Sequence, residues 1–147
     1  MSGLDDLVVR AAAADEVRPL RMAVLRPDQP VVPAEYDERP DTRHVAALAG
    51  GAVVGCASVF PSPYDGEPRA WQLRGMAVAP GRQGTGIGAR VLLGAIDVAR
   101  ASGAPLLWAN ARVTALGFYE RLGFEVVGEE YLYGPAKLPH KIIRMRL

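Results

Sequence analysis

Hydrophobic residues recur along the chain with two different periods, and the change between them separates predicted strands from predicted helices. A short apolar run predicts a first strand over residues 7–11, and apolar residues three to four positions apart predict a helix from Ala14 or Asp15 to Pro27. Later runs predict strands over 44–49, 52–60, 71–79, 106–111, 125–133 and 141–147, and helices over 85–102 and 113–122.

Glycines lie between the predicted elements, at a turn and at a helix end. Gly50 and Gly51 separate two apolar runs, which is typical of a β-hairpin. Gly103 follows the last apolar turn of the longest predicted helix, where a glycine commonly caps the C-terminus. Strands and helices in mixed order predict an α/β (α+β) class with a partly parallel sheet. Neither an internal repeat nor a linker is visible, so we expect residues 1–147 to form one domain.

Acidic residues and prolines gather between the first helix and the second strand. The prolines exclude a regular helix or a central strand, so residues 28–41 are predicted to form a long, solvated surface loop. Arg21, on the preceding helix, is likewise expected at the solvated surface. The acidic side chains of this stretch are Asp28, Glu35, Asp37, Glu38 and Asp41.

The composition narrows the classes of protein that fit. The chain has 147 residues, 50% of them hydrophobic, which is enough for a core without a covalent or metal staple. A single cysteine, Cys56, excludes an internal disulfide, and two distant histidines leave no metal-ligand motif. No apolar run reaches the length of a membrane span, and no leader pattern opens the chain. We therefore expect a cytoplasmic protein without a metal and without a membrane partner.

The net charge of +1 hides an asymmetry between the two halves of the chain. Residues 1–70 carry 7 basic and 11 acidic side chains, whereas residues 71–147 carry 10 basic and 5 acidic ones. The balance as a whole gives no reason to expect a nucleic-acid partner. The positive excess of the second half favours an anionic ligand there.

A glycine-rich loop follows a predicted strand and opens the longest predicted helix. Its sequence is Gln83-Gly84-Thr85-Gly86-Ile87-Gly88. The glycines let backbone amides turn toward one point, and a helix N-terminus attracts anions, so the loop favours a phosphate. A nucleoside-triphosphate loop would need a lysine, but the chain has none before Lys137. Residues 84–89 formally match a dinucleotide fingerprint, but the acidic residue expected about 20 positions later is missing.

Three features of the second half together resemble one known family. The loop fits the pattern Q/R-x-x-G-x-G/A, with its fixed positions at Gln83, Gly86 and Gly88. Met76-Ala77-Val78 precedes the loop as a strand end, and residues 115–124 fit the pattern A-x-x-x-Y-x-x-x-G-F. Residues 71–124 therefore resemble the GNAT superfamily of acetyl-CoA-dependent N-acetyltransferases.

The resemblance implies a fold and a co-substrate. The implied fold is a mixed, twisted, six- to seven-stranded sheet with helices on both faces, splayed between the fourth and fifth strands. Acetyl-CoA is the implied co-substrate, with no metal. Its pyrophosphate is expected at Gln83, Gly84, Thr85, Gly86, Ile87, Gly88 and Ala89. Its pantetheine arm and thioester carbonyl are expected at Met76, Ala77 and Val78, with Asn110 as a further contact.

The chemistry of acetyl transfer assigns further roles. An alkyl ammonium is neutral in about one molecule per thousand at pH 7, which costs on the order of 4 kcal/mol, so a group must take its proton. The leaving thiolate needs a proton donor, and the resemblance implies Tyr119 as this general acid. Gln72 stands where some members carry a glutamate and cannot act as a base, so it is expected, with Arg74 and Glu35, to contact the substrate. Unranked candidates for the base are Glu35, Asp37, His44, Glu67 and His140.

We therefore expect an N-acetyltransferase that moves the acetyl group of acetyl-CoA to a primary amine by direct attack in a ternary complex. Cys56 lies among apolar strand residues and is expected to be buried and inert, which disfavours a covalent acetyl-enzyme. The alternative is a catalytically weak acyl-CoA-binding sensor, supported by Gln72 alone, and a small NAD(P)-dependent oxidoreductase is a third hypothesis. The expected acceptor is a small-molecule or peptide amine, preferably a cationic one, and the sequence leaves room for a homodimer.

Overall fold

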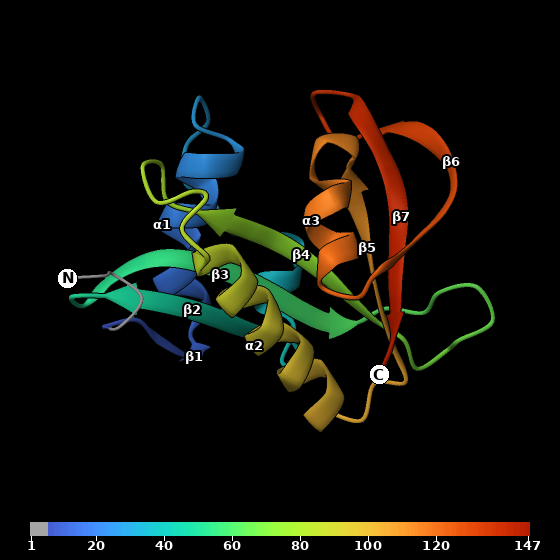
Figure 1. The fold of residues 1–147 in the computed structure, drawn as a ribbon. Coiled ribbons are helices and arrows are strands. Elements are labelled where there is room, and N and C mark those ends of the chain that lie inside the picture. The colour runs from blue at the N-terminus through green and yellow to red at the C-terminus, as the bar shows by residue number, and fades with distance from the viewer. Residues whose placement is uncertain (1–5) are drawn as a thin grey trace.

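Each strand and helix that the hydrophobic pattern predicts is present, with bounds within a few residues of the prediction. The computed structural model describes residues 6–147 (Figure 1). The strands are β1 (Val8–Ala12), β2 (Arg43–Ala49), β3 (Ala52–Pro61), β4 (Trp71–Val78), β5 (Leu106–Arg112), β6 (Glu125–Tyr133) and β7 (Leu138–Arg146). The helices are α1 (Ala14–Leu25), α2 (Ile87–Ala101) and α3 (Leu116–Arg121), with two 3₁₀ turns, η1 (Glu35–Glu38) and η2 (Val113–Ala115).

The strands lie in one 7-stranded sheet, in the order β1-β2-β3-β4-β5-β7-β6. Neighbouring strands are antiparallel except for β4 and β5, which run parallel. The chain between these two strands contains α2, which is the kind of crossover that a parallel pair requires. The mixed sheet implied by the resemblance is therefore confirmed, and β6 forms one of its edges.

The parallel strands β4 and β5 are held together at one end only. Trp71 pairs with Leu107 and Gln72 pairs with Trp108, and among the described residues these are the pairs that join the two strands. Beyond them the strands diverge, as Figure 1 shows. The predicted splay is confirmed, and it leaves backbone N–H and C=O groups along both inner edges without a strand partner.

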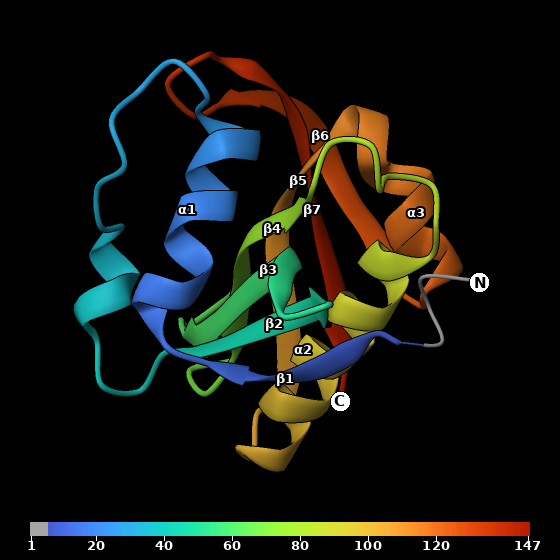
Figure 2. The same ribbon diagram turned by 90° about the vertical axis from the view of Figure 1, so that its left-hand side faces the viewer.

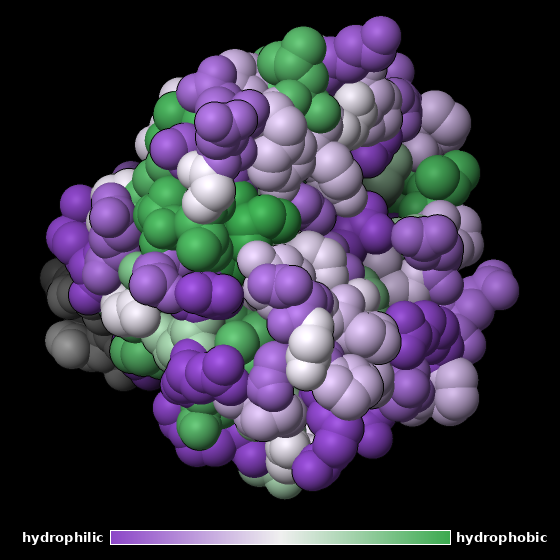
Figure 3. Space-filling view, turned by 90° about the vertical axis from the view of Figure 1, so that its right-hand side faces the viewer, coloured by the Kyte–Doolittle hydropathy of each residue, from purple (hydrophilic) through white to green (hydrophobic). Residues whose placement is uncertain are grey.

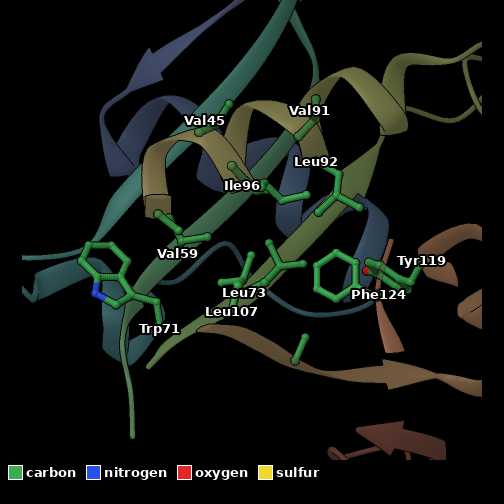
Figure 4. Packing of buried hydrophobic residues seen from close by; sticks show 14 of the residues in the cluster. Val45, Val59, Trp71, Leu73, Val91, Leu92, Ile96, Leu107, Tyr119 and Phe124 are labelled. Atoms are coloured by element: carbon green, nitrogen blue, oxygen red, sulfur yellow. The ribbon is translucent and has the colours of Figure 1, made fainter. Parts of the chain in front are cut away.

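A large hydrophobic core lies between the sheet and α2. Val91, Leu92 and Ile96 of α2 are buried together with Leu73 and Leu107 of the sheet (Figure 4). The buried helix positions recur at three- to four-residue spacing, so one face of α2 packs on the sheet and the other faces solvent. This packing fixes the start of α2, and with it the glycine loop, relative to β4.

A smaller core lies on the opposite face of the sheet, beneath α1. Val17 of α1 is buried with Ala46, Cys56 and Ala77 of the strands. Figure 2 shows α1 to the left of the strands and α3 to their right, so the prediction of helices on both faces is confirmed. Cys56 is only 1% exposed, and burial raises the pKa of its thiol to about 11, as expected for an inert cysteine.

The acidic segment after α1 departs from its prediction. Much of it is irregular and exposed, as predicted, but η1 places Asp37 inside the protein, with its side chain only 1% exposed. Arg21 donates two hydrogen bonds to this carboxylate, at 3.0 and 2.5 Å, and Arg18 donates a third at 3.3 Å. The amide of Ala34 donates a fourth at 3.0 Å. The prediction of a solvated Arg21 is wrong, because the two opposite charges are buried as a pair.

The donors around Asp37 determine its charge. Burial alone would raise the pKa of Asp37, but the hydrogen bonds from Arg21 and Ala34 and the charge of Arg21 outweigh it and lower the pKa. A carboxyl group whose pKa is lower in the folded protein than in the unfolded chain stabilises the fold above the unfolded pKa. This stabilisation is lost as the pH falls through the folded pKa.

Replacing Asp37 with Asn should cost on the order of 3–5 kcal/mol at pH 7, because it leaves the buried charge of Arg21 unpaired. Urea unfolding measures the loss, which should shrink once the pH falls below about 4. The matched control is Asp41→Asn, because Asp41 pairs with Arg39 at the surface and its side chain is 48% exposed. That change should cost less than about 1 kcal/mol. Equal losses at both positions, or a D37N loss that persists in acid, would contradict the assignment.

Candidate active site

Strand β4 contains a bulge just beyond the point where it leaves β5. Cys56 of β3 pairs with Ala77, but Ser58 pairs with Arg74, so β4 has one extra residue between the two pairs. Gly75 lies in this interval with a φ of +66°, a left-handed conformation that suits glycine. A bulge bends its strand and re-aims the backbone groups. The predicted cofactor residues at the end of β4 follow directly after it.

The glycine loop meets α2 with a geometry that suits an anion. Gly86 is the N-cap residue of α2, with a φ of +89°, and the first turn has neither a side-chain cap nor an acidic residue. The first amides of α2 have no partner within the helix and can bind a ligand. Gln83 donates a hydrogen bond from Nε2 to the carbonyl oxygen of Val78 at 3.2 Å. The predicted phosphate residues 83–89 therefore lie together at one helix end, tied to the end of β4.

The start of α2 packs against both β4 and α3. A Cβ atom on Gly88 would lie 3.4 Å from a methyl group of Val78 and 3.5 Å from the ring of Phe118. Gly88 therefore lies between the end of β4 and the helix that carries the predicted general acid. The glycine loop and the splay are neighbours in space.

Tyr119, the predicted general acid, lies in α3 at one end of the large core (Figure 4). It is 8% exposed, and its ring makes edge-to-face contacts with Phe118 and Phe124 at centroid distances of 5.2 and 5.6 Å. Burial raises the pKa of Tyr119 to about 12. The phenol therefore keeps its proton throughout the neutral pH range, as a proton donor must.

The face of the sheet opposite α2 carries the residues predicted to contact the substrate. Gln72 and Arg74 alternate with core residues and so share this face. The carboxylate of Glu35, on η1, lies 3.0 Å from the guanidinium of Arg74. Tyr36 stacks on Phe60 at a centroid distance of 5.1 Å, and the Arg74 guanidinium lies 4.9 Å from the centre of the Tyr36 ring. The turn η1 thus brings Glu35 to the same wall as Arg74.

Asn110, the last predicted cofactor contact, lies on β5 and faces the same side as Gln72. Tyr131 of β6 donates a hydrogen bond from its hydroxyl to Asn110 Oδ1 at 2.5 Å. Tyr131 also stacks on His140 of β7 at a centroid distance of 6.3 Å, and Tyr133 meets the same imidazole at 5.2 Å. We call Tyr131, Tyr133 and His140 the aromatic wall. It borders Asn110 at the mouth of the splay.

The sequence predicts His140 as one of five candidate bases but does not bring it together with Tyr131 and Tyr133. The alternation of Tyr131 and Tyr133 along a strand is the local signal of the aromatic wall, and it indicates only that both rings share one face. Tyr131 and His140 are direct partners in the ladder between β6 and β7. That pairing depends on the register of two strands, which the sequence does not specify.

Two classes of site have no support within residues 6–147. This range holds no group of three or more His, Cys, Asp or Glu side chains that could bind a metal ion. None of the helices in it has the length and apolar character needed to cross a membrane.

Figure 3 shows the face that includes the edge strand β6. Hydrophilic residues cover most of this face, and a hydrophobic area interrupts them. Leu132, on β6 itself, is 64% exposed. An open strand edge with an exposed apolar residue is a surface through which chains can associate. The homodimer stays a prediction.

Comparison with known proteins identifies a family and relatives of this chain. The sequence profile of the Acetyltransferase (GNAT) family matches residues 11–124. The uncharacterized N-acetyltransferase YitI of Bacillus subtilis (strain 168) is 29% identical over 129 residues, which cover 85% of this chain and 87% of that protein. The N-alpha-acetyltransferase RimI of Mycobacterium tuberculosis (strain ATCC 25618 / H37Rv) is 32% identical over 104 residues, which cover 69% of this chain and 65% of that protein.

Solved structures have the same fold. The yncA protein of Salmonella typhimurium, solved with its cofactor acetyl-CoA, superposes with a TM-score of 0.77 at 22% identity, covering 97% of this chain and 94% of that one. A ribosomal-protein-alanine N-acetyltransferase from Brucella melitensis superposes with a TM-score of 0.76 at 22% identity, covering 95% of this chain and 99% of that one. At this level of identity the agreement establishes the fold.

Replacing Gly75 with Ala should destabilise the protein more than the same change at Gly50. Both glycines have a positive φ, +66° and +58°, so each change carries a conformational cost of about 1–2 kcal/mol. An added Cβ atom at Gly50 has nothing within 4 Å, whereas at Gly75 it would lie 2.8 Å from Tyr36 Oη and 2.9 Å from Arg21 Cδ. The overlap should add about 1–3 kcal/mol in urea unfolding. Equal losses would show that η1 and α1 do not pack on the bulge as described.

Proposed function

Because the chain belongs to the acetyltransferase (GNAT) family, we propose that it transfers the acetyl group of acetyl-CoA to a primary amine by direct attack in a ternary complex. One observation carries the proposal: the splay between β4 and β5 opens beside the uncapped N-terminus of α2. Acetyl-CoA has a pyrophosphate and a long arm that contains two amides and a thioester. The N-terminus of a helix can bind the pyrophosphate, and the unpaired backbone groups of the strand edges can bind the amides of the arm.

The phosphate end of acetyl-CoA binds at the glycine loop in this proposal. Backbone amides from Gly84 to Ala89 hold the pyrophosphate, and the partial positive charge at the start of α2 supports them. Arg82 and Arg90 flank the loop and add to the positive charge of this half of the chain. Backbone contacts require a close approach, which glycines without side chains allow.

The arm of acetyl-CoA lies along the inner edge of β4. Backbone groups of residues 76–78 bind it where β5 has moved away, and Asn110 contacts it from the β5 side. The bulge at Gly75 turns a backbone amide toward the thioester carbonyl. An amide in that position stabilises the negative charge that develops on the carbonyl oxygen during attack.

The transfer itself moves two protons. The neutral amine attacks the carbonyl carbon, a C–N bond forms, and the C–S bond breaks with its electron pair going to sulfur. Tyr119 gives its proton to the departing thiolate. The nitrogen of the intermediate then loses a proton to the tyrosinate, which restores Tyr119. The product is a secondary amide, and free CoA carries the thiol.

Direct attack is favoured over a covalent acetyl-enzyme. Cys56 is the single cysteine of the chain, it is buried, and burial raises the pKa of its thiol to about 11. A thiol of this kind has almost no thiolate at neutral pH, and the thiolate is the nucleophile. The amine therefore meets acetyl-CoA directly.

The acceptor amine binds on the face of the sheet opposite α2, between η1 and the aromatic wall. Glu35, Gln72 and Arg74 contact it from the η1 side. The acceptor class is a small-molecule or peptide amine; the RimI relative is named for an α-amino group. A reducing compartment such as the cytoplasm fits a reaction that releases a free thiol.

A second candidate function is a catalytically weak acyl-CoA-binding sensor. The observation that favours it is Gln72, which provides an amide where an enzyme could use a carboxylate as base. Gln72 is only 7% exposed, so a water molecule does not readily act as the base in its place. Such a sensor binds acetyl-CoA but does not release CoA thiol when any amine is added.

Replacing Tyr119 with Phe should lower kcat on the order of 10²-fold while leaving the Kd for acetyl-CoA unchanged, because Phe keeps the ring packing and removes only the proton donor. Thiol release with acetyl-CoA and a panel of primary amines measures kcat, and titration calorimetry measures Kd. Tyr64→Phe is the matched control, because Tyr64 lies in the loop after β3 and its hydroxyl has no proposed role.

The outcomes of this experiment separate the hypotheses. Wild-type protein that binds acetyl-CoA and releases thiol with at least one amine supports the enzyme, and a selective kcat loss in Y119F supports the general acid. Binding of acetyl-CoA without turnover on any amine would favour the sensor. Failure of the wild-type protein to bind acetyl-CoA would overturn both.

A further inference from the structure

Direct attack requires a group that takes a proton from the acceptor ammonium, and the structure ranks the candidates. Asp37 is held by Arg21 and Arg18 and is buried, so its lone pairs are already occupied. His44 is buried on β2, with Nδ1 2.6 Å from Ser58 Oγ and Nε2 3.9 Å from the Asp37 carboxylate. Burial lowers the pKa of His44, so it accepts a proton less readily than an exposed histidine. Neither group is a suitable base.

The two glutamate candidates are ion-paired. The carboxylate of Glu35 lies 3.0 Å from the Arg74 guanidinium, and its side chain is 84% exposed. The carboxylate of Glu67 lies 2.9 Å from Arg146, in a loop that precedes β4. Carboxylates in general are weak bases at pH 7, and the oxygens of these two are engaged by guanidinium groups.

His140 has one nitrogen engaged and one available. Nδ1 lies 2.7 Å from the carbonyl oxygen of Leu138. A carbonyl oxygen can only accept, so Nδ1 carries the hydrogen and Nε2 keeps its lone pair. Within residues 6–147, Nε2 has no hydrogen-bond partner, and it is not among the side-chain atoms sealed from solvent. An imidazole nitrogen with a free lone pair can accept a proton, as a general base must.

The strand register places His140 beside the part of β5 that no longer pairs with β4. The parallel pair Gln72 and Trp108 fixes β4 against β5, and four residues further along each strand stand Met76 and Arg112. Arg112 pairs directly with His140 of β7. Positions 108, 110 and 112 of β5 share one face, so His140 faces the same side of the sheet as Gln72 and Asn110. This is the acceptor side of the proposed thioester position.

Two tyrosine rings that face His140 can bind a cationic acceptor beside it. Tyr131 and Tyr133 of β6 present their rings to the imidazole, and Tyr131 is anchored on Asn110 at the mouth of the splay. Charged neighbours on this face are Arg112, its partner on β5, and Arg144 on its own strand, which pairs with Glu125. Tyrosine rings attract an ammonium group through their π faces. An amine held there lies next to the free Nε2.

We propose that His140 is the general base of the acetyl transfer, an inference that rests on the proposed function. Nε2 of His140 takes one proton from the acceptor ammonium. The freed electron pair of the amine forms the C–N bond to the thioester carbonyl, and the C–S bond breaks as described above. The imidazolium then releases its proton to solvent. One proton leaves per amide formed, which balances the conversion of an ammonium and a thioester to an amide and a thiol.

The test is His140→Asn, because an asparagine amide can still donate to the Leu138 carbonyl but has no group that accepts a proton at neutral pH. The value of kcat/KM at pH 7 should fall about 10²–10⁴-fold, with the Kd for acetyl-CoA unchanged. The pH profile should change as well: H140N should gain activity about tenfold per pH unit up to the pKa of the amine, near 10 for an alkylamine. The wild-type profile should rise less steeply, because His140 removes the proton from the amine.

Two controls separate a base from a structural role. His44→Asn makes the same change at the other histidine and should keep the wild-type shape of the pH profile. A peptide α-amine, with a pKa near 8, should suffer a smaller H140N loss than an alkylamine, because more of it is already neutral. Equal losses for both amines, or an unchanged pH profile, would overturn the role of His140. If the wild-type protein acetylates no amine, the proposed function fails instead.

Discussion

Two neighbouring parallel strands that pair at one end only are the constraint on which the site depends. The pairs Trp71–Leu107 and Gln72–Trp108 hold β4 to β5, and the strands separate beyond them. Backbone groups that a continuous sheet would pair are left free along both inner edges, which is costly unless something else pairs them. The free strand edges, the uncapped end of α2 and the wall with His140 all meet at this opening.

A buried charge pair on the other face supports the same opening. Arg21 and Asp37 hold η1 against α1, and η1 in turn holds Tyr36. The hydroxyl of Tyr36 and the stem of Arg21 occupy the space that a side chain at Gly75 would need. The bulge is therefore enclosed by an ion pair from a segment more than 30 residues earlier in the chain, and its geometry depends on that pair. Stability and site geometry are linked through these contacts.

The sequence predicted the features that depend on residues close together in the chain. Periodicity located the helices and strands, and the glycines around Gln83 indicated the anion loop, because helix ends and tight turns depend on nearby residues. It failed at Asp37, since an aspartate in a proline-rich stretch is indistinguishable from a solvated one until Arg21 is brought to it. It also could not rank His140, whose place beside Asn110 depends on the register of β5, β6 and β7. Such pairings follow from the whole sheet.

The acidic excess of the first half is only partly offset by ion pairs with the second half. Asp37, Asp41 and Glu16 pair with arginines of the same half, which the count of charges already includes. Glu35 and Glu67 pair with arginines of the second half, so part of the acidic excess is offset there. Surface pairs of this kind contribute little field at a distance because salt and solvent screen them. The aromatic wall is the feature that favours a cationic amine more directly. There, π faces attract an ammonium group without holding a proton themselves, and the adjacent imidazole can remove one.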